Sequence, residues 1–419
     1  MSPLFFLLAA LFAQDEHAHH HHDEAAAPAG LAVIETDRNA SGTAWQPAGT
    51  PHQGWHVVAG DWQLMVHGLL FAGYDWQAGP RGGRAGLGVG WVMGMARRDA
   101  QHNSLVLRTM LSPEPWTVRD GGYPLLLQTG ETYQGQLLHD RQHPHDLFME
   151  VAGLFTQELA PALALQGYAA LAGEPALGPV AFPHRASAMA DPLATLGHHW
   201  LDSTHISFGV VTLGVVGRWA KLEGSWFNGR EPDERRWDLD LRRPDSWSGR
   251  LSLAPLEGLV AQLSFGHLAS PEAHHPGALD RFTTSLTHHV IFTEGRADTL
   301  LALGLNRMHG TQLAGLAEST VDLDGANVVF ARLEYVQKPG EDLVLAPPLD
   351  AGVYDVFGVV LGYLRNFGPW GGLVPGVGVR ASGNYVPASL GPAYGNRRFP
   401  LGAMIYVRLV PEEMHHHPE

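Results

Sequence analysis

The feature that most constrains the fold is an alternation of apolar and polar residues between positions 62 and 76. One set of alternate residues reads Trp62, Leu64, Val66, Gly68, Leu70, Ala72, Tyr74 and Trp76, and the intervening set includes Gln63, His67 and Asp75. A period of two is the signature of a β-strand with one apolar face. Because aromatic residues stand at both ends of this face, the segment is typical of a strand that faces lipid between two interfacial belts.

The same pattern recurs in segments 218–228, 329–335 and 379–385, where charged residues lie on one side only. Further candidate strands lie at 85–97, 103–111, 147–157, 163–171, 205–215, 247–254, 259–268, 281–293, 298–308, 354–366 and 399–409. Many approach the ~9–11 residues that a tilted strand needs to cross a membrane. We therefore predict an all-β fold, a single transmembrane antiparallel β-barrel of roughly 14–16 strands with a polar lumen. No later segment has ~18 consecutive apolar residues, so no transmembrane helix is expected.

The composition fits this fold and excludes other classes of protein. The 50 glycines and 29 prolines provide many turns, and a hydrophobic content of 45% is normal for an ordered chain. A formal net charge of -15 excludes a nucleic-acid partner, because the neutralisation of phosphates needs a basic surface. The absence of cysteine excludes disulfides, thiolate metal sites and cysteine nucleophiles.

Four segments are predicted along the chain. Residues 1–13 form a short apolar run followed by polar residues, which is typical of a signal peptide and predicts export to the bacterial outer membrane. Residues 14–60 contain a histidine run and no sustained periodicity, which predicts a flexible periplasmic arm. The barrel is expected over 61–410, and residues 411–419 form a histidine-rich C-terminal tail. Both histidine runs are interrupted by other residues, which favours native metal-buffering tails over expression tags.

Two long segments, 112–146 and 172–204, do not alternate, and we expect them to fold into or over the lumen as functional loops. Histidines are concentrated in and just after them, and the candidate metal ligands are His139, His143, His145, His184, His198, His199 and His205. Other polar residues near predicted strand ends form a candidate lumen or rim site, namely Asp140, Arg141, Arg185, Asp202, Ser203, Glu223, Asn228, Arg230, Glu231 and Asp233.

Imidazole and carboxylate groups in a chain without cysteine suit a divalent transition metal such as Cu, Zn or Ni. No other cofactor is predicted. The alternative interpretation is a hydrogen-bonded network that fixes the loops inside a wide barrel, because large barrels commonly hold charged networks. The sequence leaves both interpretations open.

Asp202, Ser203 and His205 also raise the question of a serine nucleophile with a histidine base. On a strand, Ser203 and His205 would share a face while Asp202 faces away, and no G-x-S-x-G motif surrounds the serine. We therefore assign no catalytic residue, and enzymatic activity stays open with a non-enzymatic role favoured.

Four motifs resemble those of a group of uncharacterised bacterial proteins regarded as exported or outer-membrane β-barrels. They are HDRQHPHDLFME (139–150), FPHRASA (182–188), LGHHWLDSTHISFGVVT (196–212) and EGSWFNGREPDE (223–234). The resemblance covers the middle of the chain and is fainter in the later strands. It implies an outer-membrane barrel in a metal-handling context, copper especially, and it carries over no substrate or catalytic residue.

The resulting expectation is an outer-membrane channel or binding protein for a small polar solute, with a divalent transition metal such as copper as the specific candidate. Two alternatives remain, an outer-membrane lipid or glycan hydrolase that uses His, Ser and Asp at the barrel rim, and a plugged structural barrel. The expected partners are outer-membrane lipid and the small solute or metal ion. The oligomeric state stays open.

Overall fold

The computed structural model describes residues 38–412 apart from 52, 120, 273–276 and 309. The predicted signal peptide, the first histidine run and the C-terminal histidine run lie outside the described residues. In the described part of the chain, no helix combines the length and the apolar character required to traverse a bilayer.

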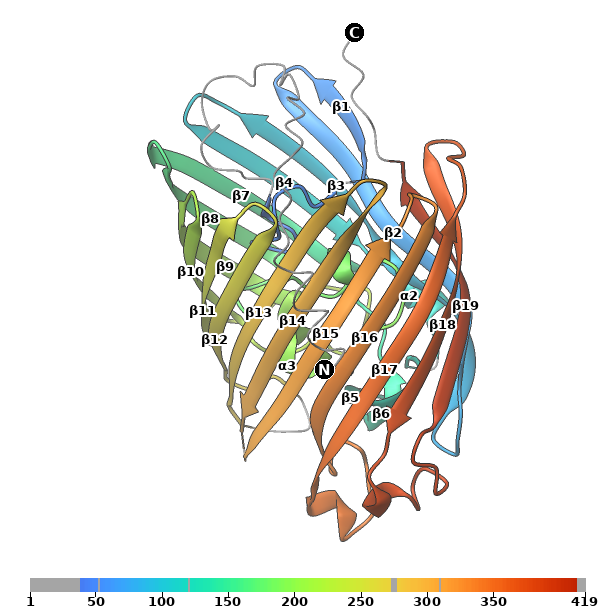
Figure 1. Ribbon diagram of the computed structural model, residues 1–419. Coiled ribbons are helices and arrows are strands. Elements are labelled where there is room, and N and C mark those ends of the chain that lie inside the picture. Colours follow the sequence, from blue (N-terminus) through green and yellow to red (C-terminus); the bar gives the residue numbers. More distant parts are fainter. Residues whose placement is uncertain (1–37, 52, 120, 273–276, 309, 413–419) are drawn as a thin grey trace, which may run out of the picture.

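Sixteen antiparallel strands form a closed barrel, β2–β4 and β7–β19, in which β19 pairs with β2 (Figure 1). Their bounds are β2 Trp62–Gln77, β3 Gly83–Asp99, β4 Asn103–Leu111, β7 Phe148–Ala160, β8 Leu163–Gly173, β9 Ser207–Gly217, β10 Ala220–Asn228, β11 Ser246–Leu256, β12 Leu259–Leu268, β13 Leu279–Phe292, β14 Gly295–Arg307, β15 Thr311–Asp322, β16 Asn327–Pro339, β17 Val353–Asn366, β18 Leu373–Tyr385 and β19 Leu401–Pro411. The all-β fold and the roughly 14–16 strands predicted from the alternation are thereby confirmed.

The alternation along each strand separates a polar interior from an apolar exterior. In β10, Lys221 and Glu223 are 0% and 4% exposed inside the barrel, whereas Leu222 and Trp226 are 62% and 58% exposed on the outside. A soluble protein would bury the apolar set instead. The inverted arrangement is therefore that of a barrel surrounded by lipid.

The two ends of the barrel differ in the length of their connections. The long segments 112–147, 174–206, 229–245, 340–352 and 386–400 all lie at one end, and short turns such as 161–162 and 218–219 lie at the other. Strand β2 starts and β19 finishes at the short-turn end (Figure 1). Because short turns face the periplasm in bacterial barrels, we call these the extracellular and periplasmic ends.

The two longest connections fold back into the lumen, as expected for segments 112–146 and 172–204 (Figure 1). The first carries α2 (Glu114–Thr117) and the hairpin of β5 (Tyr123–Tyr133) and β6 (Gln136–Gln142). The second carries α3 (His198–Leu201) and the short 3-10 turns η2 (Ala186–Ala188) and η3 (Ser203–His205). Leu126, Leu127 and Leu193 are fully buried in a core shared by these segments and the barrel wall. Two further 3-10 turns, η4 (Leu349–Ala351) and η5 (Ala388–Leu390), lie in the extracellular connections.

The N-terminal part of the described chain departs from the predicted flexible arm over 14–60. Residues 38–50 lie inside the barrel, where Ala44 and Trp45 are 2% and 5% exposed, and β1 (Trp55–Ala59) pairs with β2. Inward-facing cations hold the segment by its backbone, because Arg108 donates to Gly42 O at 2.6 Å and Lys221 donates to Thr43 O. Backbone contacts of this kind leave no periodic pattern of side chains, which is why the sequence pointed to an unstructured arm.

Candidate functional site

The histidines of the two lumen segments meet inside the barrel. His143 and His145 follow β6, His198 and His199 lie on α3, and His205 ends η3. All five imidazoles are buried, with exposed fractions of 1–7%. The short helix α3 positions His198 one turn before Asp202, so that these two side chains share a face.

Three of these side chains form what we call the imidazole triad, namely His143, His198 and His199. Each offers a ring nitrogen, and the three nitrogens lie within 4.8 Å of one another. His205 and His145 extend the cluster, because the His205 ring centroid lies 5.1 Å from those of both His198 and His145. Of the seven predicted metal ligands, five therefore gather in one place.

Carboxylates orient the rings of the cluster through Nδ1. His198 Nδ1 is 2.8 Å from Asp202 Oδ1, and His199 Nδ1 is 3.0 Å from Glu231 Oε1. Histidines that bind metals commonly have one ring nitrogen held by a carboxylate or a carbonyl while the other faces the ion.

The rings of His145 and His205 are also held through Nδ1. His145 Nδ1 is 2.7 Å from Glu114 Oε1, and His205 Nδ1 is 2.9 Å from the carbonyl oxygen of Asp202. Among the described residues, the Nε2 atoms of His143, His145, His199 and His205 are buried without a hydrogen-bond partner. A buried polar atom without a partner is costly, so these four nitrogens suit a bound cation or solute.

Two arginines balance the buried carboxylates. Arg185 lies 2.6 Å from Asp202 Oδ2 and 2.7 Å from Glu318 Oε1. Arg236 pairs with Glu131 and lies 3.1 Å from Asp146 Oδ1. Burial by itself would raise the pKa of Asp202, but the Arg185 guanidinium and the His198 ring hold that pKa well below its usual range. The carboxylate beside His198 is therefore charged at neutral pH.

The surroundings favour the neutral form of His143, His198 and His205. Burial lowers the pKa of His143 and His205 well below the usual value, and nearby Arg236 and His145 lower it further. Burial also lowers the pKa of His198, despite its bond to Asp202. For His199, burial would lower the pKa, but the Glu231 carboxylate outweighs it and raises the pKa. Neutral imidazole is the form that binds metals.

His139, Asp140 and Arg141 lie apart from the triad and hold the β5–β6 hairpin in place. Asp140 accepts hydrogen bonds from Leu127 N at 2.7 Å and from Tyr394 Oη at 3.0 Å, and its neighbour His139 lies beside it at 2.8 Å. Arg141 donates to Gly122 O at 2.6 Å. The first half of the HDRQHPHD motif therefore has structural contacts, and only its second half joins the cluster.

The remaining predicted polar residues are spread along the lumen. Glu223 lies in the periplasmic half, 3.4 Å from Lys221 and 3.2 Å from Arg250. Asn228 Oδ1 accepts a hydrogen bond from Arg230 N at 3.2 Å at the start of the 229–245 connection. Asp233 is exposed on the same connection and lies near Asp238 and Asp240. Of this set, Asp202 and Glu231 contact the triad.

Ser203 and His205 do not have the arrangement of a nucleophile and its base. Ser203 Oγ accepts a hydrogen bond from Arg281 at 3.0 Å, whereas His205 Nδ1 faces the Asp202 carbonyl oxygen. A serine nucleophile requires a base within hydrogen-bond reach of its oxygen. Among the described contacts of Ser203, none is with an imidazole.

Several residues of the site were missed by the sequence analysis. Glu114, Glu131, Arg236, Glu272 and Arg281 all contact the cluster or its carboxylates. Arg281 lies at an inward position of β13, so its place in an alternating strand could have identified it as a charged residue of the lumen. The others lie in connections, where no local pattern distinguishes a buried carboxylate from a solvated one.

A cavity of about 410 Å³ opens beside the cluster at the extracellular end. We call it the acidic vestibule. Its charged lining consists of Glu131, Glu231, Asp233, Glu234 and Glu272 with Arg230, Arg235 and Arg242. Glu231 and Glu272 lie 3.0 and 3.8 Å from His199 Nδ1, so the vestibule reaches the edge of the triad.

Comparison with known proteins supports the fold. No family model matches the sequence, and no curated protein matches it. Among solved structures, Salmonella typhi OmpF in complex with daunomycin is similar with a TM-score of 0.52 and 8% identity, over 84% of this chain and 100% of that chain. The anion-selective porin from Comamonas acidovorans has a TM-score of 0.50 and 8% identity, over 83% of this chain and 99% of that chain. At such identity the similarity concerns the fold alone. Together with the apolar exterior, it makes this chain a porin-like β-barrel of the bacterial outer membrane.

Proposed function

We propose that this outer-membrane barrel binds and conducts a divalent transition-metal ion, and that the imidazole triad is the binding site within the lumen. The observation that carries the proposal is the convergence of ring nitrogens of His143, His198 and His199 within 4.8 Å of one another. Among the described residues, the Nε2 atoms of His143 and His199 are buried without a hydrogen-bond partner, while their Nδ1 atoms face the carboxylates of Glu131 and Glu231. This arrangement supports a metal site over a loop network, because in a loop network both ring nitrogens would be expected to have hydrogen-bond partners.

The donor set suits Cu²⁺, Zn²⁺ or Ni²⁺. Three imidazole nitrogens leave a fourth position open for water or another small ligand. Among divalent ions, Cu²⁺ binds such sites most tightly, and copper is also the metal that the sequence resemblance suggests. An open, unsaturated site fits transport, because conduction requires binding that is weak enough for release.

The acidic vestibule provides an approach to the triad. Five carboxylates and three guanidiniums line it, so its side chains carry an excess of negative charge at the extracellular end. A cleft of one sign of charge concentrates ions of the other sign. A cation that enters the vestibule would meet Glu231 and Glu272 before His199. The barrel surface would contact outer-membrane lipid throughout.

The binding step can be tested by calorimetric titration of the full chain in detergent with Cu²⁺, Zn²⁺ and Ni²⁺. We expect the double variant His143→Ala/His198→Ala to bind one metal equivalent less than the unchanged protein. His102→Asn serves as the matched control, because His102 is exposed in a periplasmic turn, away from the lumen. The histidine runs at the two ends are present in all three proteins, so their background cancels. Equal stoichiometry and affinity in all three would refute the triad as a metal site.

The conduction step needs a separate measurement. Metal uptake into vesicles that contain the protein and a metal-sensitive dye should be faster for the unchanged chain than for the double variant. If the triad binds metal but no uptake occurs, the lumen segments close the path and the protein is a metal-binding barrel. Segments 112–147 and 174–206 occupy the lumen, so this outcome would assign them the role of a plug.

A further inference from the structure

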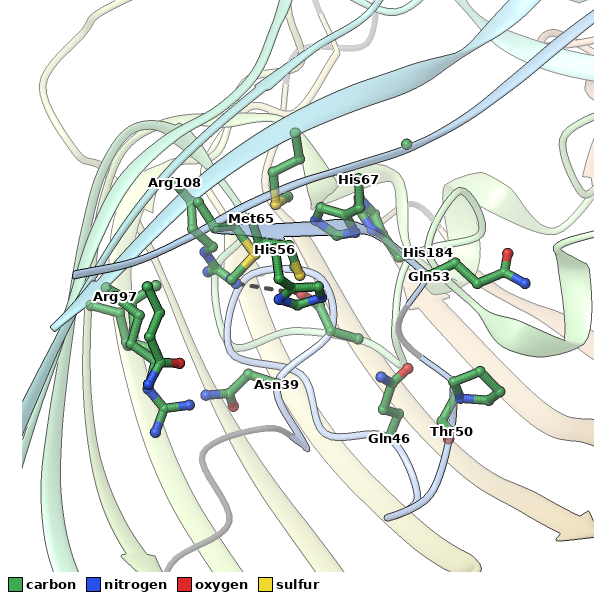
Figure 2. Close-up of a pocket in the computed structure, with 18 of the residues that line it drawn as sticks. Asn39, Gln46, Thr50, Gln53, His56, Met65, His67, Arg97, Arg108 and His184 are labelled. Atoms are coloured by element: carbon green, nitrogen blue, oxygen red, sulfur yellow. Dashed lines mark hydrogen bonds between the residues drawn. The ribbon is translucent and has the colours of Figure 1, made fainter. Parts of the chain in front are cut away.

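A second lumen cavity, of about 440 Å³, lies in the periplasmic half of the barrel (Figure 2). It separates the N-terminal segment 38–51 from the inner face of β2, β3 and β4. Four of the ten methionines of the chain line it, namely Met65, Met93, Met95 and Met189. The imidazoles of His56, His67 and His184 line the same cavity.

The strand register places these methionines side by side. Met65 on β2 is directly opposite Met95 on β3, and His67 is directly opposite Met93. Met93 is in turn directly opposite Met110 on β4. Opposite residues of an antiparallel pair have their Cβ atoms only ~4.5–5.5 Å apart on one face of the sheet. The thioethers of Met65, Met93, Met95 and Met110 and the His67 ring therefore lie next to one another on the lumen wall.

The loop that contains His184 completes this group of side chains. His184 Nε2 lies 3.0 Å from the Met110 sulfur, and its ring stacks on Trp91 with centroids 4.3 Å apart. The His67 ring approaches the same indole edge-on at 5.0 Å. Figure 2 shows His67, His184 and Met65 directed toward the cavity. Two imidazoles thus flank one indole next to a row of thioether sulfurs.

The two guanidiniums of this cavity are engaged with carboxylates. Arg108 lies 2.8 Å from Glu150 Oε1, and Arg97 lies 2.9 Å from Asp99 Oδ2. Paired in this way, they do not make the cavity a cradle for anions. The other groups in the cavity lining that could bind a ligand are the methionine sulfur atoms, the imidazoles and the Trp91 indole.

We propose that this cavity is a binding site for a soft monovalent metal ion of the Cu⁺ and Ag⁺ class, and we call it the thioether site. Soft thioether ligands select Cu⁺, whereas carboxylate and imidazole donors suit divalent ions. The imidazole triad contains no sulfur, so the two sites differ in the ion that they prefer. The thioether site does not depend on the proposed function of the triad.

The test is a calorimetric titration of the full chain in detergent with Ag⁺, which is redox-inert. We expect the double variant Met65→Leu/Met93→Leu, which changes two methionines that line the cavity, to lose one Ag⁺ equivalent or at least tenfold in its affinity. Leucine and methionine have similar volumes, so the wall keeps its packing. Met404→Leu is the matched control, because Met404 is also buried on the lumen side, on β19, outside this cavity. Unchanged Ag⁺ binding in the double variant would overturn the proposal.

A second variant and a spectroscopic measurement guard against a misfolded double variant. His184→Asn should weaken Ag⁺ binding at least tenfold while its far-UV circular dichroism stays unchanged. X-ray absorption of the protein loaded anaerobically with Cu⁺ should show sulfur neighbours, and these should be fewer in Met65→Leu/Met93→Leu. A first shell of nitrogen and oxygen alone in the unchanged protein would contradict the thioether site.

The metal site at the triad and the thioether site can be refuted independently of each other. The triad variant His143→Ala/His198→Ala should lose Zn²⁺ and keep the Ag⁺ site, whereas the methionine variant should lose the Ag⁺ site and keep Zn²⁺. Loss of Ag⁺ binding in the triad variant alone would overturn the thioether site and leave the triad as the metal centre.

Discussion

At the scale of single residues, the lumen depends on a few buried charges that join segments distant in sequence. Arg185 is the clearest case, because its guanidinium bonds both Asp202 in the loop and Glu318 on β15. Arg332 then links Glu318 to Asp191 at 3.0 and 3.1 Å. These ion pairs connect the loop that carries α3 to the barrel wall and thereby position the triad.

Replacement of Arg185 by methionine should destabilise the protein by about 3–5 kcal/mol, because the buried carboxylates of Asp202 and Glu318 each lose a cationic partner. The free energy of unfolding by urea in detergent measures this. Arg98→Met is the matched control, since Arg98 pairs with Asp61 on the surface with side chains 54% and 73% exposed. Exposed pairs contribute roughly 0–1 kcal/mol. Equal losses in the two variants would contradict this account of the lumen.

Glu174 predicts a dependence of stability on pH. Burial raises its pKa to about 8, and Arg250 only partly opposes this. In the unfolded chain the pKa is near 4.5. Between these values the folded state holds a proton that the unfolded state has released. The contribution of Glu174 to stability is therefore full below pH 4.5 and is lost as the pH rises to about 8.

Relative to Glu174→Gln, which keeps a neutral side chain, the unchanged protein should lose up to about 1.4 kcal/mol per pH unit across this window. Unfolding free energies of the two proteins at several pH values provide the measurement. Parallel pH profiles of the two proteins between about pH 5 and about pH 8 would mean that Glu174 is ionised in the folded protein across this range.

At the scale of elements, the segment 38–50 behaves as a plug rather than as an arm. Ala48 N bonds to Glu257 O at 2.9 Å, and Arg250 bonds to Thr43 Oγ1 at 2.9 Å, so the segment is attached to the wall from several strands. Gly42 allows the backbone of this segment to lie close to Glu174. At this residue φ is +53°, and an added Cβ would lie 2.7 Å from Glu174 Cβ.

Gly42→Ala should therefore release the plug and increase single-channel conductance in planar bilayers. The matched control is Gly60→Ala, where φ is +63° and an added Cβ meets nothing within 4 Å. Both variants have the backbone strain of a left-handed alanine, about 1–2 kcal/mol, but only Gly42→Ala adds the clash. Similar conductance in both variants would mean that the plug is not released by this contact.

At the scale of the whole molecule, stability depends on an apolar exterior that matches the bilayer. Leu301 lies near the middle of β14 and is 47% exposed, and Leu256 lies at the periplasmic end of β11 and is 55% exposed. The two side chains are similarly exposed but differ in membrane depth.

Leu301→Arg should destabilise the barrel by about 2–4 kcal/mol in lipid vesicles, and Leu256→Arg by about 0–1 kcal/mol, because the cost of a charge falls toward the interface. Unfolding free energies in vesicles measure the difference. In the absence of a lipid environment, where depth has no meaning, the two variants should converge. Equal costs in vesicles would mean that these positions do not differ in depth.

Much of the barrel follows from the sequence by itself, because the alternation that specifies a strand is local. The segment 62–76 predicted β2 (Trp62–Gln77), and the inward Lys221 and Glu223 opposite the outward Leu222 identified the lumen face of β10. Neighbouring strands joined by short turns then pair in order, and a closed barrel of sixteen strands results.

The contents of the lumen were decided by the tertiary structure alone. His143 and the pair His198 and His199 come from different connections, and no local pattern says which histidines of the seven candidates converge. His139 and His184 bear the same side chain, yet one holds the hairpin and the other faces a methionine. The reason is physical: a period of two is set within one strand, whereas the position of a loop inside a barrel is set by contacts with many strands at once.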